Sequence, residues 1–208
     1  MAAKLDEPQG RGDFFKALGG LLGGFIASRV EEAVTGLGPS LLRPPGAVDE
    51  VLFLATCTRC DKCLLACPEH AILRASSGSA LAMGTPYLLP RSLPCFLCPD
   101  LSCVRACPDG ALVWPSLNGV DGPRAVRMGT ARIRENRCLT WATEEASSSA
   151  SCRTCVDRCP FPAEAIRLSA AEDGVLHPEV FEAACTGCGL CAFACPVPEG
   201  AIVIEPRR

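Results

Sequence analysis

The chain is poor in aromatic residues. Its 208 residues include eight Phe, two Trp and one Tyr, against 18 Pro and 19 Gly. Because aromatic side chains supply much of the buried area of an ordinary core, this composition leaves modest material for an apolar core. We therefore expect something besides hydrophobic packing to stabilise the fold, and bound metal is one candidate.

Long apolar runs and an excess of basic charge are also missing. The longest apolar run near the start covers residues 17–27, whereas about 18 residues or more are needed to span a membrane. Membrane contact is therefore expected at most through a partner. The formal net charge is −3, so no nucleic-acid-binding surface is expected.

Motifs for catalysis are absent from the sequence. It has no nucleophile–base pair, no phosphate-binding loop and no dinucleotide fingerprint, so we predict that it is not an enzyme by itself. The two histidines, His70 and His177, are interpreted as surface residues. Trp114 and Trp141 are interpreted as ordinary packing residues, with shielding of a metal site as the alternative.

Cysteine, by contrast, is abundant, with 16 residues. This number narrows the class to a disulfide framework, a zinc protein or an iron–sulfur protein. The cysteines fall into four groups of four, and each group ends in Cys-Pro. In chain order, groups one to four are Cys57, Cys60, Cys63 and Cys67; Cys95, Cys98, Cys103 and Cys107; Cys138, Cys152, Cys155 and Cys159; and Cys185, Cys188, Cys191 and Cys195.

The spacing within the groups is typical of [4Fe–4S] ferredoxins. Groups one and four read C-x2-C-x2-C-x3-C-P, in which three cysteines hold one cluster and the fourth holds another. Zinc ribbons use separated pairs instead, and disulfide frameworks occur in shorter secreted chains. Gly187 and Gly189 would let the backbone approach a cluster closely. We therefore predict four [4Fe–4S] clusters, all sixteen cysteines as ligands, and backbone N–H groups pointing at the sulfurs.

An internal repeat supports two modules. After each Cys-Pro comes a short turn and then an apolar segment that opens with Ala, at Ala71–Leu73, Ala111–Val113, Ala165–Leu168 and Ala201–Ile204. Four units of loop, short helix and strand imply two ferredoxin-like modules. The predicted fold class is α+β: two dicluster modules with small two-stranded sheets and long cluster-binding loops, in one domain over residues 42–208.

The partner of each fourth cysteine is open on spacing alone. Groups one and four are regular and groups two and three are not, which favours a nested pairing with interleaved modules. Serial pairing, of group one with two and of three with four, is the alternative. The nested clusters would bind Cys57, Cys60, Cys63 and Cys195; Cys67, Cys185, Cys188 and Cys191; Cys95, Cys98, Cys103 and Cys159; and Cys107, Cys138, Cys152 and Cys155.

From Leu42 onward the sequence resembles the NapG/MauM type of four-cluster ferredoxin. Besides the cysteine groups, Arg43–Ala47, Gly84–Tyr87 and Arg127–Gly129 are similar to that family. The resemblance implies the nested pairing and an electron-transfer subunit. Its partners would be an electron donor or acceptor and a redox enzyme, such as a molybdenum or tungsten oxidoreductase or a membrane quinol dehydrogenase. A free-standing ferredoxin-like carrier and a non-redox zinc module are the alternatives.

Residues 1–41 are predicted to form a helical tail. A helix over residues 14–30, with Asp13 as N-cap, would place apolar side chains on one face. We hypothesise that it docks on another subunit or a second copy of the chain; a decayed export signal without a structural role is the alternative. Group three carries a polar insertion at residues 143–151, interpreted as a surface loop or a docking loop.

The tail also bears on localisation. Gln9–Lys16 looks like a twin-arginine export signal with a single arginine, Arg11, because Gly12 and Asp13 stand where the pair should continue. The NapG-type family is exported by such a signal. We therefore expect a cytoplasmic protein, with periplasmic export as the alternative.

Overall fold

The computed structural model describes residues 41–141, 152–170 and 175–207. All of these residues belong to one compact unit. The predicted helix over residues 14–30, the rest of the tail before residue 41 and the insertion at 143–151 lie outside these residues. Within the described ranges, no helix is long and apolar enough to cross a membrane.

The helices are short and are tied to the cysteine groups. Four of them have four or five residues, and each carries the third cysteine of one group. Helices of this length are not stable alone, so the surrounding loops must hold them in place. The helices are α2 (Glu50–Thr56), α3 (Lys62–Leu65), α4 (Ser102–Arg105), α5 (Thr154–Asp157) and α6 (Leu190–Ala194), with 3-10 turns η1 (Ser77–Ala82), η2 (Gly122–Ala125) and η3 (Glu135–Arg137).

The strands of the described residues form four antiparallel two-stranded sheets, which pair β1 with β2, β3 with β4, β5 with β8 and β6 with β7. The predicted strands after the Cys-Pro of groups one, three and four are present as β1, β6 and β8. The strand predicted at Ala111–Val113 is reduced to a single bridge between Leu112 and Ala47. The strands are β1 (Ile72–Arg74), β2 (Pro86–Leu88), β3 (Ser116–Leu117), β4 (Val120–Asp121), β5 (Gly129–Ile133), β6 (Ile166–Ala170), β7 (Leu176–Val180) and β8 (Ile202–Pro206).

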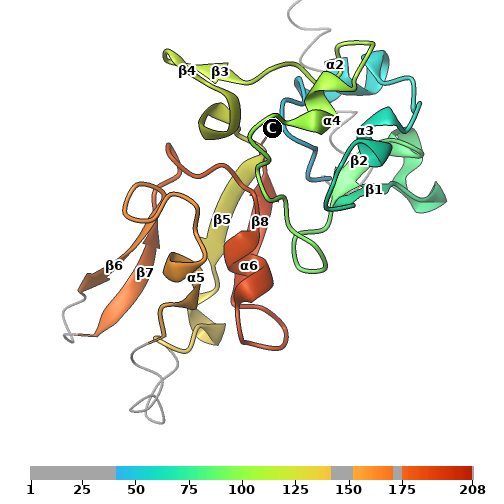
Figure 1. The fold of residues 1–208 in the computed structure, drawn as a ribbon. Helices are drawn as coiled ribbons and strands as arrows, with labels where there is room; N and C mark the ends of the chain where they lie inside the picture. The colour runs from blue at the N-terminus through green and yellow to red at the C-terminus, as the bar shows by residue number, and fades with distance from the viewer. Residues whose placement is uncertain (1–40, 142–151, 171–174, 208) are drawn as a thin grey trace, which may run out of the picture. The chain divides into compact units, whose positions relative to one another are not determined.

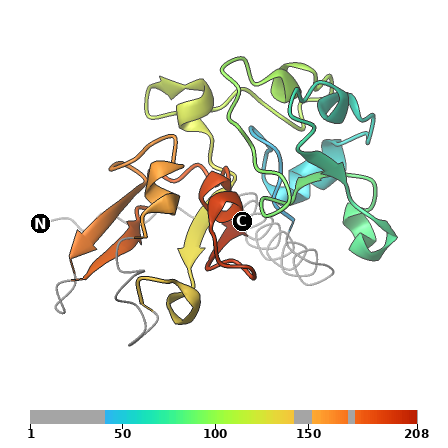
Figure 2. The same cartoon turned by 60° about the horizontal axis from the view of Figure 1, so that its bottom comes forward.

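Both halves of the described chain follow one plan. In the second half β5 pairs with β8, and the β6–β7 hairpin lies between these two strands in the sequence (Figures 1 and 2). In the first half, the chain ends are joined by hydrogen bonds from Val48 N to Ala111 O and from Val113 N to Gly46 O. They enclose the β1–β2 hairpin in the same way. We name these halves the first and second modules. They follow one another along the chain, which favours successive modules over the interleaved arrangement.

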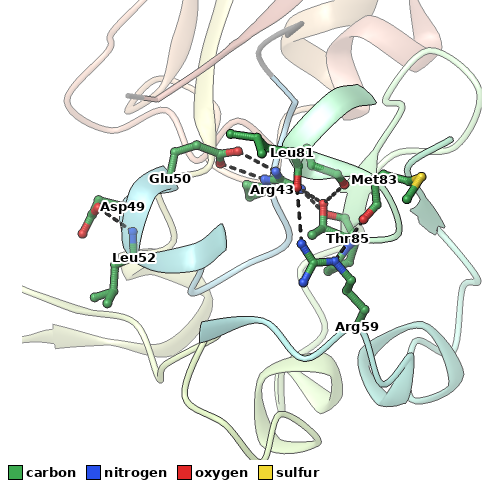
Figure 3. A network of polar contacts seen from close by, with 10 residues as sticks. Arg43, Asp49, Glu50, Leu52, Arg59, Leu81, Met83 and Thr85 are labelled. Carbon is green, nitrogen blue, oxygen red and sulfur yellow. Dashed lines mark hydrogen bonds and ion pairs between the residues drawn. The ribbon is translucent and has the colours of Figure 1, made fainter. Parts of the chain in front are cut away.

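An arginine network joins the start of the first module to its hairpin (Figure 3). The buried guanidinium of Arg43 donates to both carboxylate oxygens of Glu50 on α2, at 2.8 and 2.5 Å. It also donates to the Thr85 hydroxyl and the Pro86 carbonyl, each at 2.8 Å, and lies 4.5 Å from the centre of the Phe53 ring. Two of the segments that resemble the ferredoxin family therefore contact each other directly.

A second arginine supports the loop of group one. The Arg59 guanidinium donates to the carbonyls of Met83 at 3.0 Å and Leu81 at 3.3 Å (Figure 3). It also donates to the Cys57 carbonyl at 3.1 Å. It thereby links the segment around η1 to the loop that carries Cys57 and Cys60.

Candidate metal centres

Two hollows in the structure are each surrounded by four cysteines. The two hollows are of similar size, and their walls are made almost entirely of apolar atoms. In each case three cysteines come from one group and the fourth comes from the neighbouring group of the same module. The first hollow is lined by Cys67, Cys95, Cys98 and Cys103, and the second by Cys159, Cys185, Cys188 and Cys191.

The remaining cysteines are close to one another in the complementary combination. The thiol of Cys63 is near enough to interact electrostatically with Cys57 and Cys107. In the second module the same holds for Cys155 with Cys138 and Cys152. Of the other two remaining cysteines, Cys195 packs with Cys138 and Ala201 in one buried cluster, and Cys60 is exposed in the loop of group one.

These contacts favour the serial pairing over the nested one. Cys67 lies beside group two, and Cys159 lies beside group four. The physical reason is that α3 packs on α4 and α5 packs on α6, which sets the loops of consecutive groups against each other. Groups one and four stand apart by their shared spacing only because groups two and three contain extra residues between cysteines. This similarity does not determine which cysteine loops contact each other.

The backbone of the cysteine loops is shaped for a bound anion. Groups one, two and four each contain two residues with positive φ, at Arg59 and Asp61, at Leu97 and Leu101, and at Gly187 and Gly189. Loops of this kind form concave nests of N–H groups that bind anions, including iron–sulfur clusters.

Gly187 and Gly189 lie very close to other protein atoms, and the predicted approach of their backbone to a cluster stays a prediction. A Cβ on Gly187 would lie 2.3 Å from the Gly129 nitrogen, and a Cβ on Gly189 would lie 2.3 Å from the Pro90 Cβ. Only glycine therefore fits at either position of this loop.

Backbone N–H groups also point at individual sulfurs, as predicted. The amide of Leu112 donates to Cys107 Sγ at 3.4 Å, and the amide of Ala201 donates to Cys195 Sγ at 3.4 Å. These donors lie in the apolar segments that follow Cys-Pro in groups two and four. A third amide, that of Ala131 on β5, lies 3.5 Å from Cys185 Sγ. Hydrogen bonds to thiolate ligands stabilise their charge and tune the reduction potential of a bound cluster.

Burial sets the protonation of the cysteines. It raises the pKa of the Cys63 thiol to about 11 and the pKa of the Cys95, Cys103 and Cys155 thiols to about 12. Cys60 differs because it is exposed, and the backbone N–H of Lys62 lowers its pKa. The buried thiols need a bound cation, such as iron, to become thiolates near neutral pH.

The arrangement fits an iron–sulfur cube better than a single metal ion. A zinc site needs its sulfurs about 2.3 Å from one point. Among the described His, Cys, Asp and Glu residues, no three are placed to share one ion. Eight cysteines instead line two hollows, and amides donate to the sulfurs of Cys107, Cys185 and Cys195. Thiolates with N–H donors are the donor set that a [4Fe–4S] cube requires.

The histidines differ from each other. His70 is exposed, as predicted, but the surface position predicted for His177 was wrong, because this residue is 6% exposed. The His177 ring stacks on Trp141 with centroids 4.2 Å apart. Its Nδ1 lies 3.3 Å from the hydroxyl of Thr140, which in turn lies 3.3 Å from Cys138 Sγ. Thr140 was not identified from the sequence, and its position two residues after Cys138 was the only signal.

Comparison with known proteins agrees with this geometry. A family model described as "4Fe-4S dicluster domain" matches residues 56–111, and one described as "4Fe-4S binding domain" matches residues 177–202. The dicluster match spans cysteine groups one and two, in agreement with the serial arrangement.

Several curated proteins are similar over most of their length. The methylamine utilization ferredoxin-type protein MauM of Paracoccus denitrificans is 37% identical over 89% of this chain and 80% of its own. MauM of Methylophilus methylotrophus is 38% identical over 100% of this chain and 91% of its own. The ferredoxin-type protein NapG of Escherichia coli is 33% identical over 93% of this chain and 83% of its own. No solved structure matches.

Proposed function

Because this chain belongs to the family of ferredoxin-type electron-transfer proteins that includes MauM and NapG, we propose that its sixteen cysteines hold four [4Fe–4S] clusters and that it relays electrons between two redox partners. A bound cluster of this type supplies one-electron redox chemistry. The chain supplies the thiolates, the N–H donors and the apolar surroundings, and it is not itself an enzyme. The observation that carries the proposal is the pair of equal hollows, each bordered by four cysteines.

We assign the ligands serially, in four sets that take three cysteines from one group and one from its neighbour. The assignment follows the hollows for sets B and C and the close cysteine neighbours for sets A and D. Set A is Cys57, Cys60, Cys63 and Cys107; set B is Cys67, Cys95, Cys98 and Cys103; set C is Cys159, Cys185, Cys188 and Cys191; set D is Cys138, Cys152, Cys155 and Cys195.

The contacts between sets support a linear order A, B, C, D. Cys103 of set B interacts electrostatically with Cys63 of set A, and Cys191 of set C does so with Cys155 of set D. The middle sets are joined across the modules, because the amide of Cys95 donates to the carbonyl of Cys188 at 2.9 Å. The exposed Cys60 makes set A an accessible end for a partner.

The assignment is tested by counting iron in single and double variants of the full chain, prepared anaerobically. Four clusters correspond to about sixteen irons. Cys67→Ala should lose about four irons, and adding Cys98→Ala should remove no more, because both residues serve one cluster. Combining Cys67→Ala with Cys188→Ala should instead remove about eight.

The mirror experiment guards against a general folding defect. Cys159→Ala with Cys188→Ala should lose about four irons, and Cys159→Ala with Cys98→Ala about eight. The reverse pattern in both experiments would restore the nested pairing. A wild-type chain with far fewer than about sixteen irons would disprove the four-cluster proposal.

The partners follow from the electron-transfer role. We propose a redox enzyme, such as a molybdenum or tungsten oxidoreductase or a quinol dehydrogenase, and a separate donor or acceptor. Anaerobic purification of the full chain from its native host should recover a catalytic redox subunit. A monodisperse monomer that exchanges electrons freely would favour the alternative of a free-standing carrier.

We further propose a cytoplasmic location, because the twin-arginine-like segment contains one arginine, Arg11, followed by Gly12 and Asp13. Fractionation of host cells should recover the protein in the cytoplasm. Recovery in the periplasm would favour export.

A further inference from the structure

Arg91, in the turn after β2, reaches from the first module into the second. Its side chain donates to backbone carbonyls at and beyond the end of α6, beside which this turn passes (Figure 1). One terminal nitrogen lies 2.6 Å from the Ala192 oxygen and 2.8 Å from the Cys195 oxygen. The other lies 2.6 Å from the Val197 oxygen and 3.2 Å from the Pro198 oxygen. The last carbonyls of a helix have no hydrogen-bond partner within the helix. Here Arg91, a cation of the first module, donates to these carbonyls of the second module.

The chain on either side of Arg91 makes two more contacts with the same part of the second module. Pro90 packs against Gly189, where any side chain would collide with it. Four residues after Arg91, the Cys95 amide donates to the Cys188 carbonyl at 2.9 Å. Residues 90–95 therefore hold the loop of group four at three points, and this segment ends in a ligand of set B.

We propose that Arg91 is a positioning residue that locks the two modules together and thereby fixes the separation between the cysteines of set B and those of set C. The inference rests on the proposed function, since it takes these sets to be cluster ligands. Electron tunnelling falls steeply with distance, so the junction that sets this separation also sets how well charge passes between the modules.

Arginine suits this position for geometric reasons. The carbonyl oxygens of Ala192, Cys195 and Val197 approach two different nitrogens of one planar group. A guanidinium presents its donors as a rigid fork, whereas a lysine ammonium is a single compact charge. Arg91 is exposed overall, so its replacement removes the clamp without leaving a cavity in either core.

The test compares Arg91→Ala and Arg91→Lys with the full wild-type chain, each loaded with clusters anaerobically. Arg105→Ala is the matched control, because Arg105 is also exposed and donates at 2.9 Å to the Asp100 carbonyl within the first module. Three quantities are measured: iron per chain, hydrogen exchange of the peptides that contain residues 89–95 and 190–200, and the first-order redistribution of one electron delivered by pulse radiolysis.

The expected result for Arg91→Ala is wild-type iron, loss of exchange protection in both peptides and a slower redistribution phase. Arg91→Lys should recover part of the protection, and Arg105→Ala should match the wild type. Wild-type protection in Arg91→Ala would overturn the inference. If Arg91→Ala loses iron, the Arg91→Lys variant decides the test instead. Wild-type exchange protection together with an unchanged electron-redistribution phase in Arg91→Lys would then overturn the inference. Failure of the wild-type chain to bind about sixteen irons would count against the proposed function and not against the junction.

Discussion

The hydroxyl of Thr140 lies 3.3 Å from the sulfur of Cys138, and both residues are buried. A thiolate carries no proton, so when Cys138 binds iron the hydroxyl must be the donor. The Thr140 oxygen in turn lies 3.3 Å from Nδ1 of His177. The buried histidine therefore orients the group that donates to a ligand of set D.

Replacing Thr140 should lower the reduction potential of the set D cluster. Thr140→Val keeps the shape but removes the donor, and the more negative reduced state loses more from this than the oxidised state. A hydrogen bond of about 1 kcal/mol corresponds to a shift on the order of tens of millivolts for one electron. An anaerobic redox titration followed by electron paramagnetic resonance measures the shift.

The matched control is Thr154→Val. Its hydroxyl lies 3.9 Å from Cys152 of the same set, a weaker contact, so a smaller shift is expected. Equal potentials in wild type and Thr140→Val would show that this hydroxyl does not tune the site.

Gly187 should be intolerant of substitution for two separable reasons. It has φ +73°, and a Cβ there would meet the backbone of Gly129 at 2.3 Å. Gly110 has nearly the same φ, +71°, with open space around it. Gly110→Ala should therefore cost about 1 kcal/mol, the cost of the left-handed conformation. Gly187→Ala should cost about 1–3 kcal/mol more because β5 must move.

Thermal midpoints of the loaded proteins, recorded anaerobically at one scan rate, measure the difference. Gly187→Ala should also lose iron from set C, whereas Gly110→Ala should keep wild-type iron. Similar midpoints for both variants would mean that the loop and β5 separate easily.

Arg43→Ala should destabilise the first module. The change leaves Glu50 without its partner and removes the donor to Thr85 (Figure 3). Breaking a fully buried ion pair costs about 3–5 kcal/mol. The Glu50 side chain keeps 31% exposure and can hydrate, so we expect about 2 kcal/mol, or a midpoint lower by about 4–8 °C.

Arg43→Lys separates charge from geometry. It keeps the cation but cannot serve Glu50, Thr85 and Pro86 together, so an intermediate midpoint is expected. A wild-type midpoint for Arg43→Ala would show that the network adds no stability.

The sequence predicted most of what is local. The grouping of the cysteines and the strands at β1, β6 and β8 are encoded within a few residues of a cysteine. Short spacings restrict the backbone directly, and an apolar run after a turn has few other ways to be buried.

What the sequence did not reveal depends on distant contacts. The position of Cys67 beside group two depends on α3 packing against α4, and nothing in either spacing specifies that contact. His177 was misread for the same reason. Its burial depends on stacking with Trp141, which is distant in the sequence, so the local pattern around His177-Pro178 does not indicate the contact.

Acid should release iron from this protein. Burial raises the pKa of the metal-free Cys95, Cys103 and Cys155 thiols to about 12. A raised pKa stabilises the folded metal-free state as neutral thiols below the ordinary cysteine pKa of about 8.5, and this stabilisation disappears as the pH rises toward 12. Lower pH therefore favours the metal-free state, and higher pH favours thiolates and the loaded state.

We expect iron release to a ferrous chelator, measured anaerobically, to accelerate as the pH falls from about 8 to about 5. Cys60 differs from the buried ligands because it is exposed and the Lys62 amide lowers its pKa. Lys62→Ala leaves that backbone amide in place and removes only the nearby ammonium charge, so it should change the pH profile little. Lys62→Pro removes the amide and should move iron release from set A to higher pH. Release that does not change across this pH range would show that protonation of the cysteines does not limit cluster loss.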